Sequence, residues 1–249
     1  MAGKRDMRAA YTALTAVSLL LFSGGSTRAA DQQDVATGPG SISGLWVTVG
    51  YKGSRNNSPR ERVLKTVDGK WPPLRPEADA LLEQRIKMTE AGTPYANTMS
   101  RCLPPGVPQL SVGTAYPMQI LETPGQVTIL IEMFNHFRVI YLDADHPDYI
   151  DPSYMGHSVG HWEGDTLVVD TVGLTDNTTI DEVGMPHSDK LHVIEKYRRA
   201  ADDRLEVTIT IDDPETFTST WDAKGEFAAA PAGDSLLEFI CEPTAGPGD

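Results

Sequence analysis

The sequence predicts a mainly β protein, an antiparallel up-and-down barrel or meander with one helix. From Met118 onward, short β-prone runs follow one another with turn residues between them. Only one segment of the chain has apolar residues at helical spacing. Successive hairpins without alternating helices argue against a parallel sheet and for a barrel or meander.

The N-terminus has the pattern of a secretory signal peptide. Lys4, Arg5 and Arg8 precede an apolar run at 11–22 that is too short to span a bilayer. We therefore expect residues 1–29 to be a signal peptide and 30–249 to be one β-barrel-like domain, periplasmic or secreted. No cysteine follows the run as a lipid attachment point, so we expect no membrane insertion after cleavage. A short buried helix is the alternative interpretation.

The first predicted elements are a strand and the helix. A weakly alternating, β-rich run covers 41–52. The helix is predicted from Pro76, which suits a first helical turn, to Gly92, which offers a stop. Within it, Leu81, Leu82 and Ile86 recur at helical spacing.

The remaining elements are predicted as hairpins joined by turn residues such as Pro124-Gly125 and Gly164-Asp165. We expect about ten strands in all, and the length of residues 30–249 is within the usual range for one β domain. The predicted pairs are 118–123 with 126–134, 126–134 with 137–143, 157–163 with 166–172, and 191–199 with 205–212, followed by runs at 217–222 and 236–241.

Charge limits the possible partners. The chain has a formal charge of -14, and loss of residues 1–29 removes four basic residues and one acidic residue, which leaves -17. Nucleic acid and anionic membranes are poor partners for such a protein. A small apolar organic molecule is the expected partner, and the sequence does not indicate an oligomeric state.

The two cysteines, Cys102 and Cys241, are expected to form a disulfide, because an exported protein reaches an oxidising compartment. A reactive thiol would need a nearby histidine or helix start, and a metal site would need a second pair of ligands. We expect no metal and no cofactor.

Two glutamates are candidate catalytic groups. If Asn135-His136 is a two-residue turn, Glu132 shares an apolar face with aromatic side chains, and alternation places Glu195 inward on its strand. Burial would raise the pKa of such a carboxyl toward the range suited to acid-base catalysis. The alternative is that each glutamate pairs with an inward arginine such as Arg138, or marks a strand that faces water. The expected substrate-binding residues are Trp46, Phe134, Phe137, Tyr141, Trp162 and Tyr197.

The hairpin at 157–172 supplies the other catalytic candidates. Pairing across its turn places His157, His161 and Asp170 on one face. If this face points inward, it forms a His/Asp acid-base pair or a metal site of two histidines and one carboxylate. The opposite face, which carries Trp162, is more apolar, so we expect it to face the core and the histidine face to face water.

One motif in this hairpin is misleading. The sequence 156–160, Gly-His-Ser-Val-Gly, matches the nucleophile elbow of serine hydrolases, which requires a strand before the serine and a helix after it. Here Ser158 enters a β-hairpin, so we do not expect an esterase.

The stretch 152–171, with its Pro-Ser-Tyr-Met-Gly-His-Ser, Trp-Glu-Gly-Asp-Thr and Val-Val-Asp-Thr segments, resembles a large family of exported bacterial proteins of unassigned function. Segments 102–106, 186–188 and 212–214 resemble it too. The chain departs from that family at 143–145, where relatives usually have Asp-Gly-Arg, and after Cys241, where they usually have Glu-Asn. The resemblance implies no activity. Separately, Gly44-Leu45-Trp46 resembles the first strand of lipocalins, which agrees with a barrel.

The sequence therefore supports two functions. The first is a cofactor-independent enzyme of the lyase, isomerase or cyclase kind, which uses acid-base chemistry on an apolar molecule inside the barrel. The second is a lipocalin-like carrier that uses the same pocket without catalysis. An approach of Glu132 and Glu195 inside a dry cavity would favour the enzyme.

Overall fold

The computed structural model describes residues 40–50, 58–95, 97–112 and 114–242. These residues belong to one compact unit, Val35–Asp249. The predicted signal peptide lies outside the described residues. In the part that is described, no helix is long and apolar enough to cross a membrane.

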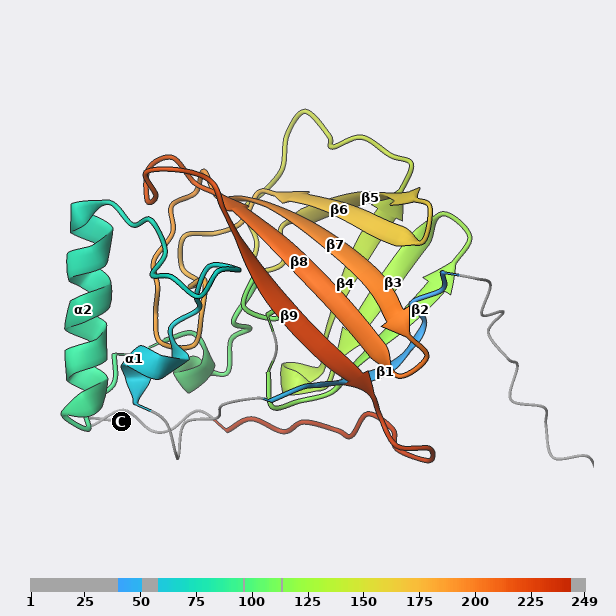
Figure 1. Ribbon diagram of the computed structural model, residues 1–249, viewed down its shortest axis with the longest axis horizontal. Coiled ribbons are helices and arrows are strands. Elements are labelled where there is room, and N and C mark those ends of the chain that lie inside the picture. The colour runs from blue at the N-terminus through green and yellow to red at the C-terminus, as the bar shows by residue number, and fades with distance from the viewer. Residues whose placement is uncertain (1–39, 51–57, 96, 113, 243–249) are drawn as a thin grey trace, which may run out of the picture. The chain divides into compact units, whose positions relative to one another are not determined.

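In the described part of the chain, nine strands form a closed barrel in which each strand neighbours the next one in sequence (Figure 1). This confirms a mainly β barrel of the lipocalin-like kind. The strands are β1 (Gly44–Thr48), β2 (Met118–Thr123), β3 (Gln126–Ile131), β4 (His136–Leu142), β5 (His157–Glu163), β6 (Thr166–Val172), β7 (His192–Ala201), β8 (Arg204–Asp212) and β9 (Trp221–Ala229). The barrel closes where β9 pairs with β1.

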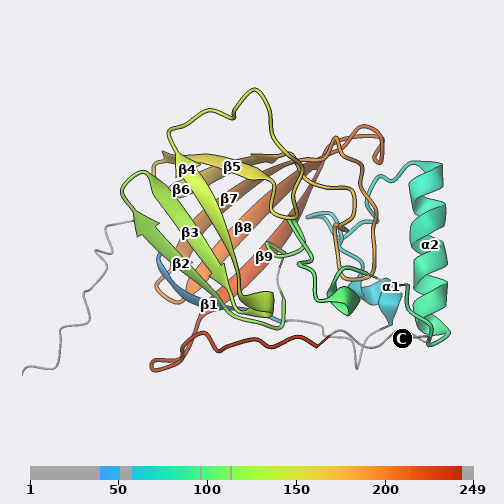
Figure 2. The same cartoon turned by 180° about the vertical axis from the view of Figure 1, so that it is seen from behind.

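One pairing departs from the expected up-and-down pattern. β4 and β5 run parallel, with Ile140 opposite Ser158 and Leu142 opposite Gly160. Parallel neighbours need a long connection, because the chain must return to the end from which it started. The loop 143–156 makes this connection and rises above β5 in both views of the ribbon (Figures 1 and 2).

The prediction of a two-residue turn at Asn135-His136 is wrong. β3 ends at Ile131, and residues Met133–Asn135 form a short 3-10 helix, η2. Phe134 and Asn135 both have positive φ, so the chain leaves the strand geometry before β4 begins. As a result, Glu132 lies on no strand and the face predicted for it does not exist.

The strands predicted at 217–222 and 236–241 also differ from the structure. β9 begins at Trp221, and its inward positions include Ala223 and Gly225, whose small side chains give little hydrophobic alternation. A Cβ on Gly225 would lie 2.6 Å from the carbonyl oxygen of Ser111, so the small residue is required by close packing. The run at 236–241 has no regular secondary structure and lies outside the barrel sheet.

The helices lie outside the sheet. α2 (Pro76–Glu90) confirms the predicted helix and buries Leu82 and Ile86 in the same apolar core as the barrel. Two shorter elements accompany it, α1 (Pro59–Arg62) and the 3-10 helix η1 (Met99–Arg101).

The predicted disulfide is confirmed. Cys102 and Cys241 are bonded, with their Cα atoms 5.7 Å apart and 139 positions apart in sequence. The bond fixes the segment that follows β9. Two further contacts hold this segment, because the Asn135 side chain exchanges hydrogen bonds of 2.6 and 3.0 Å with the backbone of Phe239.

Candidate functional site

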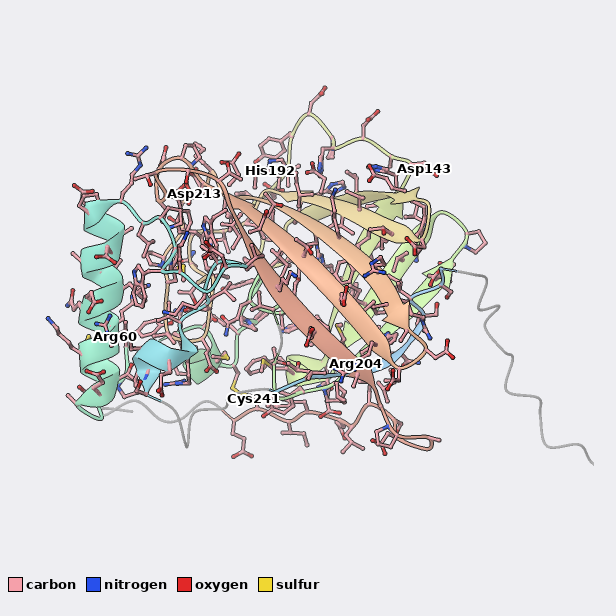
Figure 3. The ribbon with its side chains drawn as sticks, viewed as in Figure 1. Arg60, Asp143, His192, Arg204, Asp213 and Cys241 are labelled. Atoms are coloured by element: carbon pink, nitrogen blue, oxygen red, sulfur yellow. A yellow bond between two sulfur atoms is a disulfide. The ribbon has the colours of Figure 1, made fainter. Side chains whose placement is uncertain are left out.

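A cluster of three imidazoles and one carboxylate lies on the outer face of the barrel. His157 begins β5, Asp170 lies near the end of β6, and His192 begins β7, so antiparallel pairing brings all three to one end of the sheet. His146 comes from the loop 143–156 that covers this end. Figure 3 labels His192 and Asp143, where that loop begins, along the upper edge of the molecule.

The four side chains are joined by hydrogen bonds. Asp170 Oδ1 lies 3.1 Å from His146 Nε2 and 2.9 Å from His192 Nε2. The other ring nitrogen of His146, Nδ1, lies 2.8 Å from Nδ1 of His157. Within the described residues, no hydrogen bond is formed by His157 Nε2. This nitrogen is therefore the open end of the hydrogen-bonded series.

The surroundings of His157 favour its neutral form. Partial burial, and then the positive charge that His146 can carry, lower the pKa of His157. The ring of Tyr141 stacks on His157, with centroids 5.3 Å apart and planes inclined by 19°. A neutral imidazole with an open nitrogen can accept a proton, so His157 has the properties of a general base.

The cluster is partly exposed to solvent. The side chains of His146, Asp170 and His192 are 24%, 38% and 35% exposed. In the described residues, no group of three or more His, Cys, Asp or Glu side chains has the arrangement of a metal site. The contacts within the cluster instead pair donors with acceptors, as in a proton relay.

Glu195 points into the barrel, as predicted, but its surroundings are polar. It is fully buried and forms an ion pair with Arg138, whose Nη1 lies 3.1 Å from Glu195 Oε1. Burial opposes the charged form of Arg138, but the Glu195 carboxylate outweighs it and the pKa of Arg138 is raised. This is the arginine-paired alternative, so Glu195 has no free carboxylate for catalysis.

Tyr197, expected to bind substrate, belongs to the same buried network. Its hydroxyl donates to Glu195 Oε1 at 2.9 Å, and burial followed by the nearby carboxylate raises the pKa of Tyr197. Ser158 and Thr171 complete the network, and their hydroxyl oxygens lie 3.0 Å apart. Because Ser158 is buried and held in this way, the Gly-His-Ser-Val-Gly motif carries no exposed nucleophile.

The inward position expected for Glu132 is wrong. Its carboxylate accepts a hydrogen bond of 2.8 Å from the backbone N–H of Leu237 at the protein surface. Phe134 packs against Phe239, with ring centroids 5.0 Å apart, beside the same segment. Both residues hold the C-terminal segment in place, and Glu132 does not approach Glu195.

The remaining predicted residues divide between core and surface. His161 lies on the outer face with a 54% exposed side chain and pairs with Glu163, apart from the cluster. Trp46 is buried and donates from its indole to Ile42, and Trp162 packs against the core. Phe137 is 64% exposed. The Trp162 face of the hairpin therefore faces the core, and the histidine face faces outward, as expected.

Sequence reasoning missed three important residues. His146 lies in a loop, and a loop has no periodicity from which to place a side chain. Alternation places His192 on the face of its strand opposite to Glu195, which indicates an outward position but no partner. The one available signal was that all six histidines fall between 136 and 192. For Arg138, the sequence indicates only an alternative partner for a glutamate.

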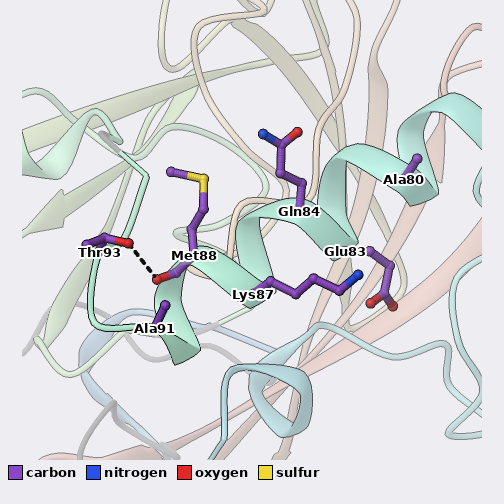
Figure 4. Close-up of a pocket in the computed structure, with 7 residues that line it drawn as sticks. All are labelled: Ala80, Glu83, Gln84, Lys87, Met88, Ala91 and Thr93. Atoms are coloured by element: carbon purple, nitrogen blue, oxygen red, sulfur yellow. Dashed lines mark hydrogen bonds between the residues drawn. The ribbon is translucent and has the colours of Figure 1, made fainter.

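A surface hollow of about 530 Å³ lies along α2 (Figure 4). It is lined by one face of that helix and the following turn, and in this set Thr93 donates to the carbonyl oxygen of Met88. Its one carboxylate, Glu83, is paired with Arg60. The lining of the hollow therefore has no unpaired carboxylate for acid-base chemistry. Its lining residues are Ala80, Glu83, Gln84, Lys87, Met88, Ala91 and Thr93.

Comparisons of the chain with protein-family models, with curated proteins and with solved structures gave no match.

Proposed function

We propose that the protein is an exported enzyme that performs acid-base chemistry on a small apolar or aromatic molecule, of the lyase, isomerase or cyclase kind. The reaction site lies on the outer face of the barrel, where β5 begins and β6 ends, and His157 Nε2 is the general base. The observation that carries this proposal is the hydrogen-bonded series Asp170, His146, His157, which ends in an open nitrogen. The leader pattern and the disulfide support export.

The proton positions in this series follow from its chemistry. An ionised carboxylate only accepts hydrogen bonds, so Nε2 of His146 donates to Asp170. In neutral His146 the other nitrogen, Nδ1, is then an acceptor, and it takes a hydrogen bond from Nδ1–H of His157. Neutral His157 consequently carries its lone pair on Nε2, where a substrate proton can be received.

The relay also accounts for the charge that a base acquires. When His157 Nε2 takes a proton from a C–H or O–H group, the imidazole becomes positive and the substrate becomes negative. Transfer of Nδ1–H from His157 to His146 moves the positive charge next to the Asp170 carboxylate, which stabilises it. Return of the proton to a different substrate atom completes an isomerisation, and departure of a leaving group completes an elimination.

Exposed aromatic side chains on the outer face of β4 suit an apolar substrate. Tyr141 is 44% exposed and stacks on His157, and Phe137 lies on the same outer face of β4. An aromatic molecule that packs on these rings would bring its acidic proton near His157. The barrel interior is a weaker candidate, because Glu195 is held by Arg138 and large apolar side chains fill the core.

Proton abstraction can be tested before the natural substrate is known. The mature protein is incubated in D₂O with a panel of aromatic ketones such as phenylacetone, and deuterium incorporation is followed by ¹H NMR. We expect His157→Gln to lower the exchange rate by about 10²- to 10⁴-fold, which is the usual contribution of a general base. His161→Gln is the matched control, because His161 lies on the same face of the same strand but outside the relay.

Two results would contradict the proposal. Equal exchange rates for the wild type and His157→Gln would remove the base. Binding of the panel without any exchange would favour the carrier function instead.

A further inference from the structure

A buried polar network lies inside the barrel, directly behind the outer histidine cluster. Its members come from four neighbouring strands, with Arg138 on β4, Ser158 on β5, Thr171 on β6 and Glu195 on β7. All four residues are at most 4% exposed. The function proposed above uses none of them.

The network and the cluster are attached to the same stretches of backbone. Ser158 follows His157 and Thr171 follows Asp170, and successive residues of a strand point to opposite faces. Each outer group of the relay on β5 and β6 therefore has a network member as its immediate neighbour on the inner face. Movement of either strand would move both sets together.

Arg138 connects the strands through its guanidinium group. Nε donates to Ser158 Oγ at 3.0 Å and Nη2 donates to Thr171 Oγ1 at 2.7 Å. Both terminal nitrogens also bind the Glu195 carboxylate. A planar group with fixed donor directions requires its acceptors at fixed positions, which sets the relative placement of β4, β5, β6 and β7.

Among the junctions that join β4 to β7, the one between β4 and β5 has the shortest ladder and most needs such a device. Its parallel ladder contains three residue pairs, against seven for β5 with β6 and six for β6 with β7. On the outer side of this junction, His157 stacks on Tyr141 of β4 and is hydrogen-bonded to His146 of the loop that follows β4. The hydrogen bond from Arg138 to Ser158 crosses it from the inside.

Stability alone does not explain a buried ion pair here. Apolar residues of similar volume often stabilise a core as well as an ion pair does, because burying two charges carries a large desolvation cost. The directional bonds of the network instead specify one register. We infer that Arg138 is a positioning residue, which acts with Glu195, Ser158 and Thr171 to hold His157 Nδ1 against His146 Nδ1. The inference deepens the proposed function and rests on it for its catalytic consequence.

The test replaces the whole ion pair, so that no charge is left buried alone. Arg138→Met/Glu195→Leu is compared with the wild type by ¹⁵N NMR of the histidine side chains, which reports the tautomer of His157. We expect loss of the Nδ1–H tautomer and faster amide exchange across the β4–β5 junction. Ketone exchange should fall on the order of 100-fold in kcat with a smaller change in KM, as for a misplaced catalytic group.

Two further variants keep the test decisive. Thr171→Val removes one acceptor of Arg138 at nearly constant volume, and it should shift the same histidine signals in the same direction. This single variant provides the test if the double variant does not fold. Cys102→Ser/Cys241→Ser lowers stability without touching the network and should retain the wild-type tautomer.

A folded double variant with the wild-type tautomer and junction exchange would overturn the positioning role. This outcome differs from a failure of the proposed function, in which His157→Gln retains full activity while the tautomer still depends on Arg138.

Discussion

The two faces of the sheet formed by β4, β5, β6 and β7 carry polar groups with opposite properties. On the inner face, Arg138 and Glu195 are buried, and each charge is paired. On the outer face, His157, Asp170 and His192 are partly exposed, and the series ends in an open nitrogen. Burial forces complete pairing, because an unpaired buried charge is costly, whereas the surface permits a group to remain available. The open group is the one suited to chemistry.

The largest expected effect comes from breaking the inner pair. Arg138→Met leaves the Glu195 carboxylate buried without its cation and should lower the free energy of unfolding by about 3–5 kcal/mol. Chemical denaturation monitored by circular dichroism measures this loss. Arg138→Met/Glu195→Leu should recover most of it, and a double variant as unstable as the single one would show that the charge itself is not the cause.

A buried histidine extends the comparison to pH. Burial is the main cause that lowers the pKa of His187, despite a hydrogen bond to the carbonyl oxygen of Ser188. The folded state therefore binds fewer protons than the unfolded state, whose histidine titrates near pH 6.5. The stability contributed by neutral His187 is complete above about pH 6.5 and is lost as pH falls toward its folded pKa.

The measurement is the free energy of unfolding between pH 7.5 and 5. Each proton taken up on unfolding contributes at most about 1.4 kcal/mol per pH unit. His187→Gln should flatten this part of the profile, and His161→Gln, at a side chain that is 54% exposed, is the control for removal of an imidazole. Parallel profiles for the wild type and His187→Gln would assign the acid sensitivity to other groups.

Replacement of the outer base should separate stability from activity. His157→Gln is expected to change the free energy of unfolding by less than about 1 kcal/mol, as for other partly exposed positions outside the core. Thermal denaturation measures the change in stability, which should be small, while the D₂O assay should show the large loss in ketone exchange. A loss of stability as great as that of Arg138→Met would mean that the outer cluster is structural.

The smallest effect is expected at Glu132. Glutamine retains an oxygen that accepts the hydrogen bond from the Leu237 N–H, so Glu132→Gln should cost less than about 0.5 kcal/mol and leave exchange activity unchanged. Denaturation and the D₂O assay measure both quantities. A 100-fold loss of activity would restore Glu132 as a catalytic candidate.

The sequence by itself determined the elements whose signals are local. The bounds of β5 and β6 agree with prediction, because alternating β-prone residues flank a Gly-Asp turn, and the same alternation placed His157 and Asp170 on one face. The inward position of Glu195 follows from the same period of two. The disulfide was predicted from the two cysteines together with the expectation of export.

Only the tertiary structure decided which of these residues meet. Two positive φ values near Phe134 ended β3 early and removed Glu132 from the predicted face. The parallel junction of β4 and β5 brought Arg138 to Ser158, and the loop between these strands brought His146 to Asp170. Local periodicity fixes the face on which a side chain lies. Strand order, register and the path of a long loop depend on packing between residues far apart in sequence, which one chain read in order does not reveal.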